Sequence, residues 1–164
     1  MKKILIILLA LLSLTACQEY GKKEADPKER YIYLIEMLEE HQNFADSSSY
    51  FDIGVEMARI DDGYRYYIII DEPKLAMYDV EVLAIEKGVD YLDNMAANVG
   101  IFEDMQYNLV PNQTNAKRGF VKGVVASGVT GKAETKLYVF VQFKNSDYSS
   151  VHTEYFEFTA RYEE

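Results

Sequence analysis

The stretch FDIGVEMA, residues 51–58, decides the fold class of this chain. Phe51, Ile53, Val55 and Met57 alternate with polar or small residues, which is the period of a β-strand with one buried face. Before this stretch the apolar residues recur at helical spacing, and after it apolar runs alternate with turn residues. The sequence therefore predicts a helical N-terminal part followed by a β-rich remainder.

The residues that precede this stretch predict one helix, over about 27–46. Asp26 stands at the N-cap position, Pro27 at the first helical position and Glu29 at the third, which is a variant of the capping box. We expect one apolar face of the helix to pack on a sheet. That face consists of Tyr31, Leu34, Ile35, Leu38 and, more loosely, Ala45.

Strand patterns follow one another to the end of the chain, with turn signals between them. Residues 64–70 (YRYYIII) are apolar on both faces, so we expect a central strand that is covered on both sides. Residues 90–98 interrupt the series and predict a short helix, which Gly100 would end. The other predicted strands are 78–85, 105–109, 119–126, 137–143 and 152–162.

One helix followed by about seven strands is typical of a mainly β fold, an antiparallel β-sandwich with one N-terminal α-helix. We expect a single globular domain over 26–164, with the sandwich over about 50–162. The same order of elements also fits an α+β fold in which the helix packs on a curled antiparallel sheet, and the sequence leaves this alternative open.

Part of the strand region resembles a known class of domain. The run 107–113 (YNLVPNQ), followed by 119–123 (GFVKG) and 137–141 (LYVFV), resembles the second half of immunoglobulin-like or fibronectin-type domains of bacterial lipoproteins. The resemblance implies an immunoglobulin-like sandwich. The Cys–Trp–Cys core of antibody domains is missing, because the chain has no tryptophan and only one cysteine.

The N-terminus has the layout of a secretory signal. Two lysines precede the apolar run 4–12, and Leu14-Thr15-Ala16-Cys17 resembles the lipobox of bacterial lipoproteins. The resemblance implies cleavage between Ala16 and Cys17 and a lipid on the Cys17 thiol. Residues 1–16 would then be the signal peptide and 17–25 a short lipid-anchored tether. We expect the domain at the outer face of the plasma membrane, or at the outer membrane of a cell that has two.

Charge limits the possible partners. The formal net charge is −10, and removal of Lys2 and Lys3 with the signal would make it −12. Such a surface repels phosphate backbones, so we expect no nucleic-acid partner. The membrane partner is the lipid on Cys17, and the short tether favours a membrane-proximal protein, peptide or glycan as a second one.

Catalytic and metal-binding patterns are weak. Neither His41 nor His152 has a second ligand at metal spacing, and the residues around Ser127 lack the glycines of a hydrolase elbow. We therefore expect no cofactor, no metal and no enzyme activity. Acidic loop residues such as Asp61 and Asp62 leave two alternatives: a calcium site, or a cell-envelope hydrolase that uses loop carboxylates.

Two connections are longer than a hairpin needs, residues 88–104 and 111–118, and such connections often carry function. Both are rich in amide side chains, which suit recognition of a peptide or of sugar hydroxyls. The alternative is that these residues only close one end of the sandwich. The tyrosines of 64–67 are a second possible recognition surface. The candidate binding residues in the two connections are Asn94, Asn98, Asn112, Gln113 and Asn115.

Overall fold

The computed structural model describes residues 26–91 and 94–163, which form a mainly β structure with one α-helix. Its elements are α2 (Pro27–Glu40), β1 (Asp52–Ile60), β2 (Gly63–Asp71), β3 (Tyr78–Glu86), β4 (Ala97–Val99), β5 (Asn108–Leu109), the 3-10 helix η1 (Ala116–Arg118), β6 (Phe120–Val121), β7 (Val124–Thr130), β8 (Glu134–Lys144) and β9 (Val151–Arg161). Cys17 and Ala16, the expected lipidation and cleavage residues, lie outside the described residues.

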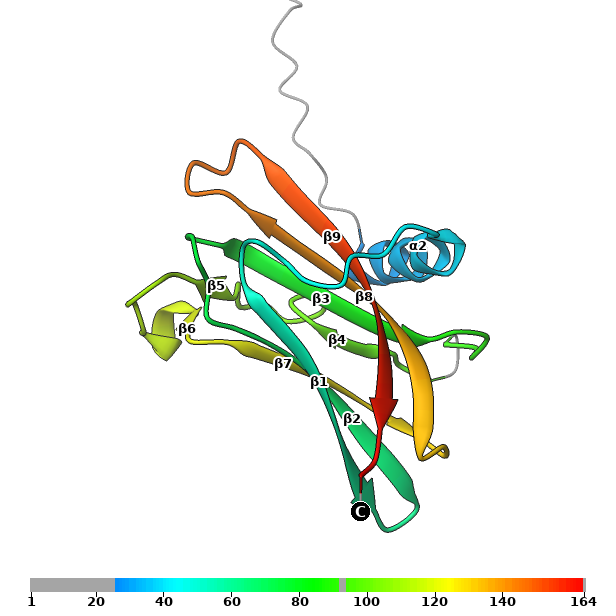
Figure 1. The fold of residues 1–164 in the computed structure, drawn as a ribbon. Helices are drawn as coiled ribbons and strands as arrows, with labels where there is room; N and C mark the ends of the chain where they lie inside the picture. Colours follow the sequence, from blue (N-terminus) through cyan, green and yellow to red (C-terminus); the bar gives the residue numbers. More distant parts are fainter. Residues whose placement is uncertain (1–25, 92–93, 164) are drawn as a thin grey trace, which may run out of the picture.

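The strands form two antiparallel sheets that face each other as a sandwich (Figure 1). One sheet has the order β1-β2-β7 and the other the order β4-β3-β8-β9. A small parallel pair, β5 and β6, lies beside them. Since β7 pairs with β2, and β8 with β3, each sheet combines strands that are distant in the sequence.

The main core fills the space between the two sheets. Tyr66, Ile68 and Ile70 contribute from β2, and alternate residues of β8 contribute from the opposite sheet. The Phe51 ring contacts the rings of Phe143 and Phe156 edge to face, and all three side chains are buried. The two-residue period of the strands therefore places their apolar sides inside, as the sequence predicts.

The helix α2 adds a third layer on the outer face of the four-stranded sheet (Figure 1). Leu34 and Leu38 pack against Leu83 of β3 and Phe140 of β8. Arg30 ties the helix to the sheet, because its Nε lies 3.1 Å from both carboxylate oxygens of Glu81. The helix thus packs one apolar face on a sheet of the sandwich, as the sequence predicts.

The helix is shorter than predicted. It ends at Glu40, because His41 adopts an extended backbone conformation with φ −66° and ψ 142°. The chain then runs along the edge of β9, where the Ala45 N–H donates to the Tyr155 carbonyl at 2.8 Å. Ala45 therefore belongs to the sheet edge and not to the helix.

The predicted central strand is also not covered on both sides. In β2 the inward residues are buried, but Tyr67 and Ile69 on the other side are only half-buried. The doubly covered strands are β3 and β8. Val82 and Val139 face the other sheet, while Leu83 and Phe140 face α2. The sequence shows that both sides of a strand are apolar, but it does not show which layer covers each side.

Two further segments differ from the prediction. The described part of 90–98 contains no helix, and its last two residues belong to β4, which pairs with β3. The predicted strand 119–126 is divided into β6 and the beginning of β7. Gly123 marks the break, since a Cβ there would lie 2.6 Å from the Ile70 carbonyl oxygen.

Candidate functional site

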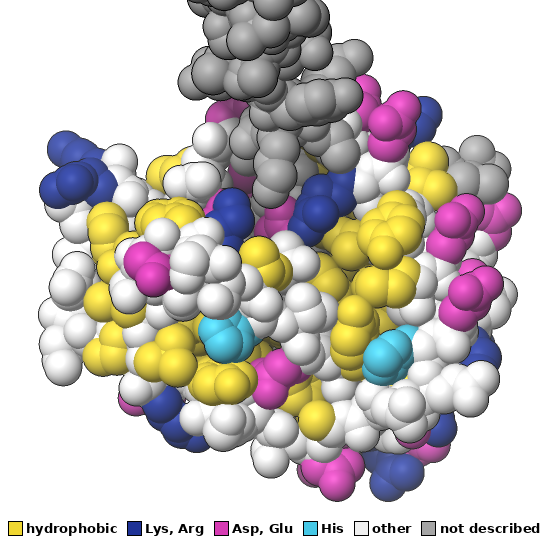
Figure 2. Space-filling view, turned by 90° about the horizontal axis from the view of Figure 1, so that it is seen from above, with side chains coloured by type: hydrophobic (Ala, Val, Ile, Leu, Met, Phe, Trp, Pro, Cys, Tyr) yellow, Lys and Arg dark blue, Asp and Glu magenta, His cyan; other side chains and the backbone are white. Residues whose placement is uncertain are grey.

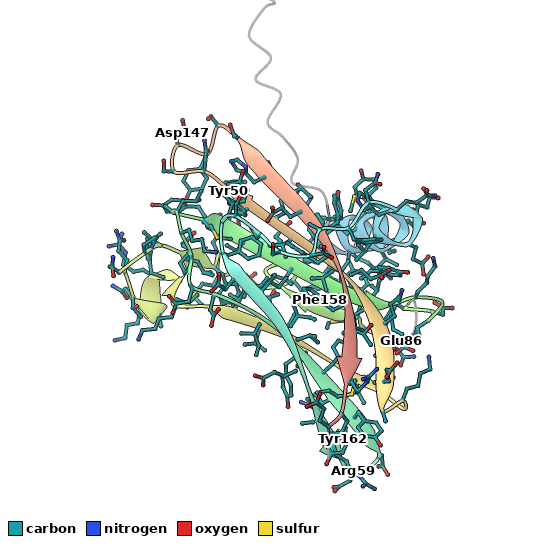
Figure 3. All side chains as sticks on the ribbon, in the orientation of Figure 1. Tyr50, Arg59, Glu86, Asp147, Phe158 and Tyr162 are labelled. Carbon is teal, nitrogen blue, oxygen red and sulfur yellow. The ribbon has the colours of Figure 1, made fainter. Side chains whose placement is uncertain are left out.

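A hollow of about 780 Å³ opens at one end of the sandwich, between the C-terminal half of β7 and the segment that follows β3. We call it the tyrosine hollow. It is lined by Tyr66, Glu86, Val89, Tyr91, Asn94, Met95, Ser127, Gly128, Val129, Thr130, Gly131 and Lys132. Glu86 marks this end of the molecule in Figure 3, opposite the turn that carries Asp147.

Tyr66 reaches the hollow from the middle of β2, across the neighbouring strand. Its register partner in β7 is Gly128, and a Cβ on that glycine would lie 2.2 Å from the Tyr66 hydroxyl oxygen. Only glycine leaves room for the phenol here. The ring itself is buried in the core, at 2% exposure.

The hydroxyl groups of Tyr66 and Tyr91 influence each other's pKa in the hollow. Burial raises the pKa of Tyr66 well above its ordinary value, and the contact with Tyr91 raises it further. Burial also raises the pKa of Tyr91, whose hydroxyl accepts the Glu86 backbone N–H at 2.7 Å. Both phenols therefore stay protonated at neutral pH and act as neutral hydrogen-bonding groups.

Glu86 is a buried carboxylate at the end of β3. Burial alone would raise its pKa, but hydrogen bonds from Lys132, Thr130 and Thr135 outweigh that effect, so the pKa lies below its ordinary value. Lys132 also forms an ion pair with it. The carboxylate is ionised at neutral pH, and its hydrogen-bonding capacity is used by these three residues. Its role in the hollow is therefore structural.

The remaining lining is apolar or neutral. Met95 and Val129 are 68% and 58% exposed, while Asn94 and Ser127 add an uncharged amide and a hydroxyl. Glu86 is the only carboxylate among the described residues that line the hollow, so no second acid faces it there. The arrangement can hold an uncharged ligand by hydrogen bonds and apolar contact.

The five predicted binding residues do not come together. Asn94 lines the tyrosine hollow, whereas Asn112 and Gln113 line a separate hollow of about 270 Å³ next to Lys122. The C-terminal half of β7 lines the first hollow, whereas the second lies before the N-terminal end of that strand.

Asn98 and Asn115 lie outside both hollows. Asn98 stands in β4, and its side-chain amide donates to the Ala96 carbonyl at 2.9 Å. Asn115 is exposed, and its backbone pairs with Phe120. These two residues shape local backbone, and the single binding face expected from the two long connections divides into two sites.

The sequence prediction missed Glu86, Tyr91 and Lys132. A glutamate at the end of the predicted strand 78–85, directly after the apolar residues 82–85, is the one available signal for Glu86, because a charge there needs a partner. That partner, Lys132, comes 46 residues later. No local pattern links the two positions.

The histidines and the acidic loops do not form a metal-ligand group in the described chain. His41 stacks on Tyr155, with ring centroids 3.8 Å apart, and His152 stacks on Phe143 at 5.0 Å. Figure 2 shows the two imidazoles as separate patches among hydrophobic side chains. Within residues 26–91 and 94–163, no group of three or more potential metal ligands occurs. Likewise, no helix in those ranges has the length and apolar character needed to span a membrane.

Comparison with known proteins adds no relative. No protein-family model, no curated protein and no solved structure matches this chain.

Proposed function

We propose that the protein is a bacterial lipoprotein, anchored through a lipid on Cys17 to the outer face of the plasma membrane, or to the outer membrane of a cell that has two. The support is the lipobox-like run 14–17, which contains the only cysteine of the chain. Two acyl chains on that residue would hold the domain durably at the bilayer.

Anchoring is tested with Cys17→Ser in the full chain. The parent should fractionate with membranes and incorporate a labelled fatty acid, and the variant should lose the label. A variant that is still cleaved, unlabelled and equally membrane-bound would disprove lipid anchoring.

We further infer that the sandwich is immunoglobulin-like. In such domains strands A, B and E share one sheet, and strands C, F and G share the other. The orders β1-β2-β7 and β3-β8-β9 correspond to these two sets, and β4 takes the place of the extra strand beside strand C. An experimental structure that shows a different strand order would refute this inference.

Within that frame we propose a non-enzymatic binding module whose ligand is a neutral, hydroxyl-rich molecule such as a glycan. One observation carries this proposal: the tyrosine hollow combines protonated phenols, an amide and exposed apolar side chains, while its only described carboxylate is neutralised by Lys132. Sugars present the matching mixture of hydroxyls and apolar ring faces.

The test is binding of neutral oligosaccharides to the detergent-solubilised full chain, measured by titration calorimetry. Asn94→Ala should weaken binding by about fivefold to tenfold, the value of one lost hydrogen bond. Asn115→Ala, a matched amide outside the hollow, should leave the affinity unchanged. If both variants bind like the parent, or if no oligosaccharide binds, the glycan proposal is wrong.

A further inference from the structure

One sheet face of the sandwich has no layer over it. The four-stranded sheet carries α2 on its outside, but no described helix or strand packs on the outer face of β1-β2-β7 (Figure 1). We call this surface the open face. Its exposed positions include Val125 and Val129, at 51% and 58%, and its centre is Tyr67 of the middle strand.

Strand pairing arranges the open face as a grid of three rows, each crossing β1, β2 and β7. Residues directly opposite one another in antiparallel strands share a face. The rows are Gly54-Ile69-Val125, Glu56-Tyr67-Ser127 and Ala58-Arg65-Val129. Apolar and small residues therefore surround Tyr67, and one acid and one base complete the set.

The two charges of the grid are free to meet a partner. Glu56 and Arg65 are both exposed, and neither forms an ion pair with another described residue. They lie on adjacent sides of Tyr67, in the first and second strand. A twofold axis that lies parallel to the sheet and runs diagonally across the grid through Tyr67 exchanges the positions of Glu56 and Arg65.

We propose that the open face is the interface of a homodimer, in which a second copy of this chain packs with its strands nearly at right angles. The diagonal axis places Glu56 of each copy against Arg65 of the other. It also places Val129 against Gly54, where the space above the backbone is open. Near-orthogonal packing of two sheets is one of the two arrangements that twisted sheets favour.

The apolar pattern of β2 explains why a partner is needed. Tyr67 and Ile69 are large apolar residues on the side of the strand that the chain itself leaves uncovered. A contiguous apolar patch framed by polar residues marks an interaction surface. The chain has a net charge of −10, and a second copy is compatible with it because this face carries its opposite charges in balance.

Cysteine crosslinking in membranes tests the interface with the full chain. The diagonal axis brings Val125 next to Val125 of the second copy, so Val125→Cys should form a disulfide-linked dimer under mild oxidation. Val151→Cys is the matched control, because Val151 is a valine of similar exposure, 55%, at the start of β9. The parent chain gives the background due to Cys17.

Charge reversal tests the proposed pairing. In the Val125→Cys chain, Glu56→Arg or Arg65→Glu should each reduce the dimer yield about tenfold, since like charges would face each other. The two reversals combined should restore the yield. Thermal unfolding of each variant, which should match the parent, separates loss of pairing from loss of fold.

Two outcomes would overturn the dimer. The first is equal crosslinking of Val125→Cys and Val151→Cys, which shows random collision. The second is a doubly reversed chain that dimerises no better than the single variants while folding normally. Ser127 and Val129 also line the tyrosine hollow, so glycan binding is measured separately, at Asn94.

Discussion

The hydroxyl group of Tyr66 lies over Gly128, so close that a Cβ on the glycine would stand 2.2 Å from the phenol oxygen and 2.4 Å from Cζ. This contact joins β2 to β7 at the floor of the tyrosine hollow. It also makes the glycine a requirement of the sequence, because no other residue leaves the ring in place.

Gly128→Ala should therefore destabilise the domain by about 1–3 kcal/mol, the usual cost of overpacking a well-filled site. Gly131→Ala is the control, since a Cβ at Gly131 meets nothing within 4 Å. Chemical denaturation measures both free energies of unfolding. Equal stability of the two variants would show that Tyr66 moves aside easily.

Tyr31→Phe should cost about 1–3 kcal/mol of stability, because it leaves a buried donor without an acceptor. The Tyr31 hydroxyl accepts the Ala96 backbone N–H at 2.6 Å, which ties α2 to the segment before β4. Tyr33→Phe, on the exposed side of the same helix, should have no effect on unfolding. A loss of stability in both variants would contradict this account.

Lys132→Met should destabilise the domain at neutral pH and have little effect in acid. The folded-state pKa of Glu86 is depressed, so its stabilising contribution is present above the unfolded-state pKa and is lost as the pH falls through the folded-state value. Removal of Lys132 weakens that contribution only while Glu86 is ionised. Urea unfolding across the pH range from neutral to acid should show the difference between variant and parent shrinking.

Lys136→Met provides the comparison for this experiment. Lys136 pairs with the exposed Glu157, and ion pairs of that kind contribute little in water. A pH-dependent loss of the same size at Lys136 would mean that burial of Glu86 is unimportant.

Asn112→Ala should lower stability by about 1 kcal/mol, because Asn112 has a left-handed backbone with φ 62°, which alanine tolerates poorly. Asn112→Gly should retain full stability. Asn115→Ala should also be neutral, since its φ of −154° suits any residue. Thermal unfolding of the three variants measures these differences in stability. If Asn112→Ala is as stable as the parent, the turn accommodates alanine without strain.

Local patterns predicted much of the fold. Alternation from Phe51 onwards identified the strands, and the Asp26 cap located the start of α2, where its carboxylate accepts the Lys28 N–H at 2.8 Å. The end of the helix was not predictable in this way. Ala45 pairs with a strand that comes more than a hundred residues later, and that tertiary contact overrides the local spacing.

The candidate site was predictable only in part. Asn94 was identified because the connection that carries it is long and polar, and it does line the tyrosine hollow. The tyrosine pair and the Glu86–Lys132 ion pair depend on which strands become neighbours. Tyr66 meets Gly128 only because β7 returns beside β2, and the order of strands in a sheet cannot be read from the residues of one segment.

The position of α2 has a consequence for how the chain acquires its structure. This helix is the first described element to be synthesised, yet its apolar stripe packs on Leu83 of β3 and Phe140 of β8. Leu38 therefore meets partners that come 45 and 102 residues later in the chain, and contacts between such distant positions slow folding. Until those strands are made the stripe is bare, and a chaperone that shields exposed apolar surface would act on it at this stage.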